Sequence, residues 1–207
     1  MRNIGARPVR LALVASLLVL SGVAWMAPAH ASSFGGRAYS AYVNVLGAGP
    51  LYIADTGALP ADGGWSGATL EGTAVPGVLS AETLVAATSG ALTSTAGDQV
   101  NSLTSLANVV VLPGQAAEIT ASFVQAQADA TDVGPSGGSQ IDGLTFGGVP
   151  VQVTGLPNQT ISLPGVATLV INEQTTTLQG IVVNALHLIL SAGGEIVVSS
   201  ASSSISQ

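Results

Sequence analysis

Short turn motifs interrupt this chain at close intervals and limit what it can fold into. From residue 47 onward the motifs GAGP, ADGG, VPG, LPG (twice), GPSGG, IDG and FGG separate runs rich in Val, Ile, Thr and Ser. Gly and Pro in such pairs mark turns, and the residues between them favour strands. Among the residues that suit exposed helices, Lys is absent and Glu is rare. The pattern predicts one all-β domain, an antiparallel β-sandwich or jelly-roll-like fold, with a β-solenoid as the alternative. A solenoid would require a fixed repeat, and the sequence shows none.

Two Gly-Gly pairs predict tight hairpins with two-residue turns. Around Gly147-Gly148 we expect Phe146 to pair with Val149 and Leu144 with Val151. Around Gly193-Gly194 the same rule gives the pairs Leu190 with Val197, Leu188 with Ser199, Leu186 with Ala201 and His187 with Ser200.

The strand before the second hairpin is apolar on both faces. Residues 181–190 read IVVNALHLIL, with only Asn184 and His187 polar. A strand of this kind is typical of the centre of a sheet, covered on each side or covered on one side by an oligomer partner.

The first residues have the three parts of a secretory signal peptide. Three arginines precede the apolar stretch LALVASLLVLSGVAWM, and AHA at residues 29–31 is a small-x-small cleavage motif. We therefore expect a signal peptide at 1–31 and a single domain at 32–207. The end of the chain shows no hydrophobic tail, so the expected location is secreted or loosely attached to the cell surface, without an integral membrane anchor.

Removing residues 1–31 leaves a strongly acidic chain. Arg37 is then the one cationic residue and all eleven carboxylates remain, which gives a formal charge of −10. Such a surface repels phosphate backbones, which argues against a nucleic-acid partner. The absence of cysteine excludes disulfides, thiolate metal sites and thiol nucleophiles.

Four blocks of the sequence carry a resemblance to a known family: GGRAYSAYVNVLG, GLPNQTISLPGVATLVINEQ, VNALHLIL and GGEIVVSSASSSI. In these blocks and their order the chain resembles the choice-of-anchor P family of exported bacterial proteins. The resemblance implies a surface or secreted β-domain whose members use different sorting tails, and it implies no enzyme activity. The two LPG motifs lack a following Thr-Gly, so we interpret them as turns.

The triplet Asn172-Glu173-Gln174 and His187 are the polar residues that most invite a catalytic interpretation. Triad chemistry needs a nucleophile and a carboxylate gathered around the histidine, and the sequence contains no GxSxG motif. We therefore interpret the triplet as a strand end whose amides satisfy backbone groups, and His187 as a paired, half-buried neutral residue. No catalytic, cofactor-binding or metal-binding residue is assigned, and no cofactor is expected.

A calcium ion is the one metal that the sequence raises. Asp129, Asp132 and Asp142 lie around a Gly-rich segment, and Ca²⁺ prefers oxygen ligands. Their spacing matches no EF-hand loop, so a solvated acidic loop is the preferred interpretation. The eleven carboxylates offer no pair whose spacing indicates glycoside hydrolysis.

Two classes of function remain. The first is a non-catalytic structural or interaction protein of the cell exterior, with an unknown envelope or extracellular partner. The second is a secreted carbohydrate-binding module or polysaccharide-acting hydrolase, because Trp65, Tyr39, Tyr42 and Tyr52 could stack on sugars. The position of Trp65 discriminates between them: exposure beside a tyrosine favours binding, and burial favours a structural role.

Overall fold

A computed structural model describes residues 32–93 and 97–206. The chain divides into two units, Met1–His30 and Ala31–Gln207, and the predicted signal peptide lies outside the described residues. In the described ranges, no helix has the length and hydropathy needed to cross a bilayer.

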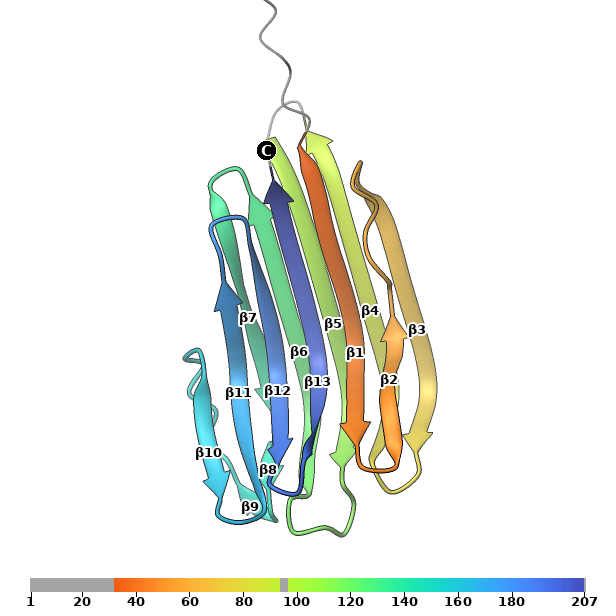
Figure 1. Ribbon diagram of the computed structural model, residues 1–207, viewed down its shortest axis with the longest axis vertical. Coiled ribbons are helices and arrows are strands. Elements are labelled where there is room, and N and C mark those ends of the chain that lie inside the picture. The colour runs from red at the N-terminus through yellow and green to blue at the C-terminus, as the bar shows by residue number, and fades with distance from the viewer. Residues whose placement is uncertain (1–31, 94–96, 207) are drawn as a thin grey trace, which may run out of the picture. The chain divides into compact units, whose positions relative to one another are not determined.

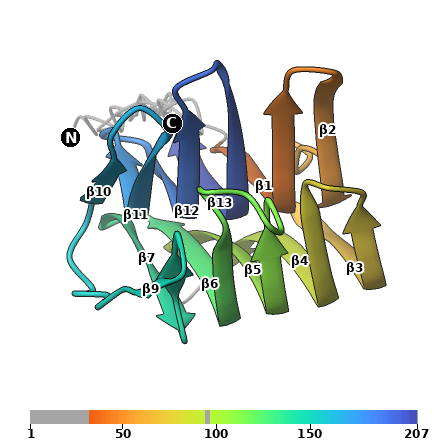
Figure 2. The same cartoon turned by 90° about the horizontal axis from the view of Figure 1, so that it is seen from below.

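Two antiparallel sheets pack face to face (Figures 1 and 2), which confirms the predicted all-β sandwich. Sheet A has the strand order β10-β11-β12-β13-β1-β2, and sheet B has the order β3-β4-β5-β6-β8-β9 with β7 paired to β6. The strands of sheet A are β1 (Ser33–Val45), β2 (Ala48–Asp55), β10 (Gln159–Leu163), β11 (Ala167–Thr176), β12 (Gly180–Leu190) and β13 (Gly194–Ser206). Those of sheet B are β3 (Gly64–Val75), β4 (Leu79–Thr93), β5 (Gly97–Val111), β6 (Ile119–Thr131), β7 (Gly134–Asp142), β8 (Thr145–Phe146) and β9 (Val149–Pro150).

The three Pro-Gly motifs form equivalent turns, as predicted. In each, the residue after Gly donates its backbone N–H to the residue before Pro: Val78 to Val75 at 2.9 Å, Gln115 to Leu112 at 3.0 Å and Val166 to Leu163 at 3.0 Å. The glycines have φ of 73° to 74°. Pro with its fixed φ followed by Gly with positive φ is the signature of a type II turn. Both LPG motifs are therefore turns.

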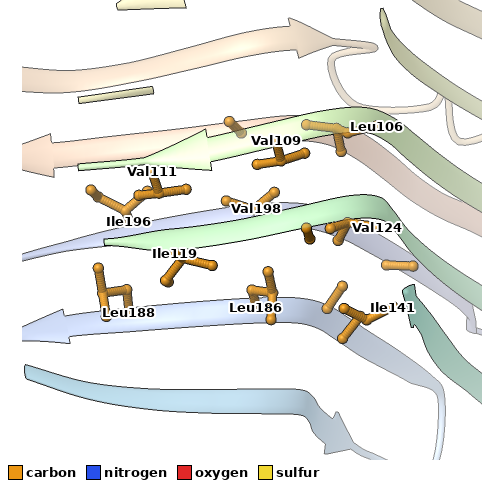
Figure 3. Close-up of a cluster of buried hydrophobic side chains, with 14 of the residues drawn as sticks. Leu106, Val109, Val111, Ile119, Val124, Ile141, Leu186, Leu188, Ile196 and Val198 are labelled. Carbon is orange, nitrogen blue, oxygen red and sulfur yellow. The ribbon is translucent and has the colours of Figure 1, made fainter. Parts of the chain in front are cut away.

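Large aliphatic side chains from both sheets meet in one layer between them. Figure 3 shows Val109 of sheet B next to Val198 of sheet A, and Ile119 of sheet B next to Leu188 of sheet A. Each of the four is at most 1% exposed. Burial of such side chains is worth roughly 1.5 to 3 kcal/mol each and supplies most of the stability of a chain without disulfides.

Both predicted hairpins form, but only the first has the predicted register. Phe146 pairs with Val149, and the Val151 N–H donates to the Leu144 carbonyl at 2.9 Å. In the second hairpin the predicted register was wrong by three residues. The structure pairs Leu188 with Ile196, His187 with Val197 and Leu186 with Val198. The connection is a three-residue loop, Ser191 to Gly193, closed by the Gly193 N–H on the Leu190 carbonyl at 3.0 Å. Gly193 supplies the positive φ that follows the turn in such loops, and Gly194 already belongs to β13.

Strand β12 lies in the middle of sheet A, as its apolar sequence predicts. Only its inner face is buried within this chain, so the first expected arrangement, cover on each side, was wrong, and cover of the outer face by an oligomer partner stays a prediction. Val182 and Ile189 point outward and are 39% and 43% exposed.

Each sheet bends along a row of residues that crosses its strands. We call such a row a crease, so each sheet has one. In sheet A the row crosses all strands from β2 to β11 and consists of Ala54, Ser40, Ser199, Ala185 and Asn172. Every second strand has a left-handed residue there: Ala54, Ser199 and Asn172 have φ of 46°, 61° and 51°. The crease therefore recurs in step across the sheet, as β-bulges do where a strand must bend.

Sheet B has a matching crease made of Gly72, Glu82, Asn108, Ser122 and Gly143. Again every second strand is left-handed, with φ of 61°, 50° and 64° at Gly72, Asn108 and Gly143.

The two creases place their extra residue on opposite sides of their sheets. In sheet A two consecutive residues point inward, such as Ser40 and Ala41. In sheet B the extra residue points outward, so Asn108 is exposed and the buried positions jump from Leu106 to Val109. Because one sheet gains its residue on the inside and the other on the outside, the two layers bend together and stay packed (Figure 3).

Candidate interaction face

The outer surface of sheet A carries the tyrosine, histidine and arginine side chains of the described residues. We define the tyrosine–histidine face by nine residues that lie there: Arg37, Tyr39, Tyr42, Tyr52, Asp55, Glu173, Asn184, His187 and Glu195. Two ladder rows carry most of them. One runs Glu173, Asn184, Ser200, Tyr39, Asp55, and the other runs Val170, His187, Val197, Tyr42, Tyr52. The crease lies between the two rows.

The crease is the reason that two of the tyrosines share a face. Tyr39 and Tyr42 are three residues apart in β1, and strict alternation would send them to opposite sides of the sheet. Ser40 and Ala41 both point inward at the crease, so Tyr39 and Tyr42 both point outward. Tyr52 from β2 then pairs with Tyr42.

The three tyrosine rings form one cluster. The ring centroids of Tyr39 and Tyr52 lie 5.1 Å apart at 79°, and those of Tyr42 and Tyr52 lie 4.8 Å apart at 38°. Edge-to-face and tilted pairs at these distances are the favourable aromatic geometries. Tyr52 is the most exposed ring of the three, at 42%. Burial raises the pKa of Tyr39, so its phenol stays neutral.

Arg37 closes the cluster at one end. Its guanidinium carbon lies 4.2 Å from the centroid of Tyr52, and its Nε and Nη2 donate to the two carboxylate oxygens of Asp55 at 3.0 and 2.7 Å. This fork raises the pKa of Arg37 and lowers the pKa of Asp55, whose Oδ1 also accepts the Gly57 N–H at 3.0 Å. The cation is therefore held over the Tyr52 ring, with the Tyr39 centroid 5.4 Å away.

His187 lies between two carboxylates at the other end of the face. Its Nδ1 is 2.9 Å from Glu173 Oε2, and its Nε2 is 3.0 Å from Glu195 Oε2. Asn184 also donates to Glu173 Oε2, at 2.6 Å. Both ring nitrogens therefore face carboxylates, whereas a serine triad has one ring nitrogen hydrogen-bonded to the hydroxyl of the nucleophile. The arrangement can hold a polar group of a ligand.

The triplet 172–174 divides between the two sides of sheet A. Asn172 and Gln174 point inward, where Asn172 Nδ2 donates to the Gly155 carbonyl at 3.2 Å and Gln174 Nε2 to the Gly137 carbonyl at 3.3 Å. The amides do satisfy backbone groups, as predicted. Their predicted position was wrong, because the triplet lies inside β11 at the crease rather than at a strand end. Glu173 points outward to His187, and the prediction missed this.

The three aspartates that were considered as calcium ligands do not meet. Asp129 accepts from Gln127 Nε2 at 2.8 Å, and Asp132 accepts the Asp98 N–H at 2.9 Å. Asp142 pairs with Phe123, six residues along β6 from Asp129, a separation of about 20 Å in a strand. Within residues 32–93 and 97–206, no group of three His, Asp or Glu side chains converges as a metal site requires.

The position of Trp65 separates a binding role from a structural role only in part. It is 73% exposed, which argues against a core role. It belongs to the outer face of sheet B, opposite Ser89 of β4, whereas the three tyrosines lie on the outer face of sheet A. The aromatic residues therefore form two separate surfaces. No family model, curated protein or solved structure matches the chain.

Proposed function

We propose that this chain is a non-catalytic secreted or cell-surface interaction protein of the choice-of-anchor P type, and that the tyrosine–histidine face binds its partner. One observation carries the proposal: three of the seven aromatic residues beyond residue 31 gather on one outer surface together with Arg37 and His187. Aromatic and Arg side chains are enriched at interfaces and carry most of their binding energy.

The state of the groups on this face supports binding rather than catalysis. In the two ion pairs of this face, Nε and Nη2 of Arg37 bind the Asp55 carboxylate, and both ring nitrogens of His187 lie within hydrogen-bond distance of a carboxylate. Groups held in this way are rigid, so little side-chain entropy is lost when a ligand docks on them.

The test is binding of the purified protein to envelope fragments of the cells that export it. The variant Tyr42→Ser/Tyr52→Ser should lower the retained fraction at least tenfold. Leu156→Ser removes exposed apolar surface from the loop between β9 and β10 and should bind like the wild type. Equal retention of all three proteins, at equal stability by circular dichroism, would refute the proposal.

Carbohydrate binding is a second candidate for the same face, favoured by the exposed Tyr52 ring. Adding soluble wall polysaccharide to the same assay separates the candidates. Competition that requires Tyr42 and Tyr52 assigns a glycan, and retention that survives the polysaccharide but not protease treatment of the fragments assigns a protein.

A further inference from the structure

Strand β3 ends sheet B with an unpaired edge. Within the described part of the chain it pairs only with β4. It is twelve residues long, and its first eight, 64–71, precede the crease. Figure 2 shows it as the outermost strand of its layer, on the same side as β2 of sheet A. An open edge of this kind presents a row of backbone N–H and C=O groups that only another extended chain can satisfy in full.

The other strands at the limits of the two sheets carry features that discourage pairing. Strand β9 has two residues and ends in Pro150, β10 has five residues, and β7 has Pro135 at its second position. Beyond β2 the chain stays on β1, through the Leu59 N–H on the Gly36 carbonyl at 2.7 Å. Short strands, prolines and covering segments are the usual protection of a sheet edge. Residues 64–71 of β3 have no proline and no cation, and Glu71 is the one charged residue of the strand.

Exposed apolar side chains accompany this edge. Trp65 is 73% exposed on the outer face. Leu70 of β3 and Leu51 of β2 pair with the buried Leu84 and Val43, so they point between the sheets, yet they are 42% and 44% exposed. The interior is thus open to solvent beside Leu51 and Leu70, whereas nearer the start of β3 the segment after β2 contacts the strand, with Ser66 Oγ donating to the Thr56 carbonyl at 2.7 Å. A partner strand would cover backbone and apolar groups together.

We propose that β3 pairs antiparallel with β3 of a second copy of this chain, which joins the two B sheets into one. A copy of the same strand offers a ladder of equal length, and a two-fold axis normal to the sheet keeps the outer faces together. An axis at Gly67 places Trp65 opposite Thr69 of the second copy, an aromatic and β-branched pair of the kind that stabilises sheets. It leaves Glu71 clear of its own counterpart.

The conformation of Trp65 agrees with an axis at Gly67. Its ring lies along its own strand above Gly67, where an added Cβ would come within 2.6 Å of the ring. Glycine at this position leaves room for the two tryptophan rings, one from each copy, to cover the centre of the joined sheet.

The test is the mass of the full protein in solution by light scattering across a concentration series. The wild type should show a concentration-dependent dimer. Trp65→Glu, which puts a carboxylate on the edge, should weaken self-association at least tenfold. Thr83→Glu adds the same charge to the same outer face on the internal strand β4 and should dimerise like the wild type. Both positions are exposed, so circular dichroism should show both variants folded.

Three outcomes would overturn the proposal. The first is a wild type that stays monomeric up to about 1 mM, where even millimolar affinity would be visible. The second is a Trp65→Glu variant that dimerises like the wild type. The third is an equal loss in Thr83→Glu, which would assign the effect to net charge. Hydrogen exchange gives a second readout, because the amides of residues 64–71 should gain protection with concentration while those of β10 do not. The tyrosine–histidine face plays no part in these measurements, so this proposal and the proposed function fail separately.

Discussion

The interior of the sandwich has two halves of different chemistry, one on each side of the crease. Toward the β12–β13 loop lies an aliphatic half, formed by Leu79, Val109, Val111, Ile119, Leu169, Leu188, Ile196, and by Leu186 and Val198 next to the crease. Toward the other end lies a hydroxyl half, where Thr88, Ser102, Thr104 and Ser203 are buried among small alanines and beside the apolar side chains Phe34, Leu84, Val100 and Val183. Apolar packing therefore holds both halves together, and the second half adds buried hydroxyl groups.

Hydroxyl groups connect the sheets directly in the second half. Ser102 of β5 donates to the Ser202 carbonyl of β13 at 2.7 Å, and Ser203 donates to the Ala128 carbonyl of β6 at 2.8 Å. Thr104 and Ser199 share a further hydrogen bond across the layer. Small side chains allow the backbones this close, and the hydroxyls prevent buried polar atoms from being left unpaired. The comparison shows that cross-sheet hydrogen bonds accompany apolar packing in the half where many of the side chains between the sheets are small.

The largest expected effect is a truncation in the aliphatic half. Leu186→Ala removes a side chain that is 1% exposed, so it should lower the free energy of unfolding by about 2 to 5 kcal/mol. Urea unfolding measures the loss. Leu46→Ala, at a side chain that is 82% exposed, is the matched control and should change almost nothing. A loss for Leu186→Ala of less than about 1 kcal/mol would mean that this half is loosely packed.

Overpacking should affect the hydroxyl half next. A Cβ added at Gly36 would overlap the Thr88 hydroxyl oxygen, so Gly36→Ala should cost about 1 to 3 kcal/mol. Thr88→Ala removes the overlapping atom. In a double-mutant cycle the second substitution should then recover part of the cost of the first. Additive losses would show that the sheets are not in close contact there.

Removal of one cross-sheet hydroxyl should cost less. Ser203→Ala leaves the Ser102 hydroxyl with Thr88 and the Ser202 carbonyl, so we expect a loss of about 1 kcal/mol in urea unfolding. If this loss equalled that of Leu186→Ala, the hydroxyl network would be worth more than its single bonds indicate.

The crease itself can be tested with two alanines of the same row. Ala54 has φ of 46°, a conformation that costs an L-residue roughly 1 to 2 kcal/mol. Ala54→Gly should therefore be neutral or stabilising by a few tenths to about 1 kcal/mol. Ala185 lies in the same row without a positive φ, and Ala185→Gly should destabilise by about 0.5 to 1 kcal/mol. Thermal unfolding gives the signs, and equal signs would refute the strained conformation of Ala54.

The turn motifs of the sequence predicted the fold correctly. The prediction failed at two places: the register of the C-terminal hairpin, and the crease, where inward- and outward-pointing residues stop alternating. The Pro-Gly turns and the Gly147-Gly148 hairpin follow from local conformational preferences. The register of the C-terminal hairpin does not, because Gly193 and Gly194 fit a two-residue turn as well as a three-residue loop. The crease was also outside prediction, since Ala54 and Ser199 adopt left-handed φ without being Gly or Asn. Without the crease, Tyr39 and Tyr42 fall on opposite faces, so the tyrosine–histidine face could not be recognised.

The smallest expected effect is a change of the unfolding free energy with pH. It should be seen for a surface ion pair and not for either half of the interior. No buried residue in the described ranges has an ionisable side chain, so the losses in Leu186→Ala and Ser203→Ala should not change with pH. Asp55 is different, because Arg37 holds its pKa below the ordinary range. A carboxylate with a lowered folded pKa stabilises the protein above its unfolded pKa, near pH 4, and loses this contribution as pH falls through the folded value. The difference in unfolding free energy between the wild type and Asp55→Asn should therefore be constant at neutral pH and shrink below about pH 4. A difference that persists unchanged in acid would show that the Arg37–Asp55 pair adds no stability through its charge.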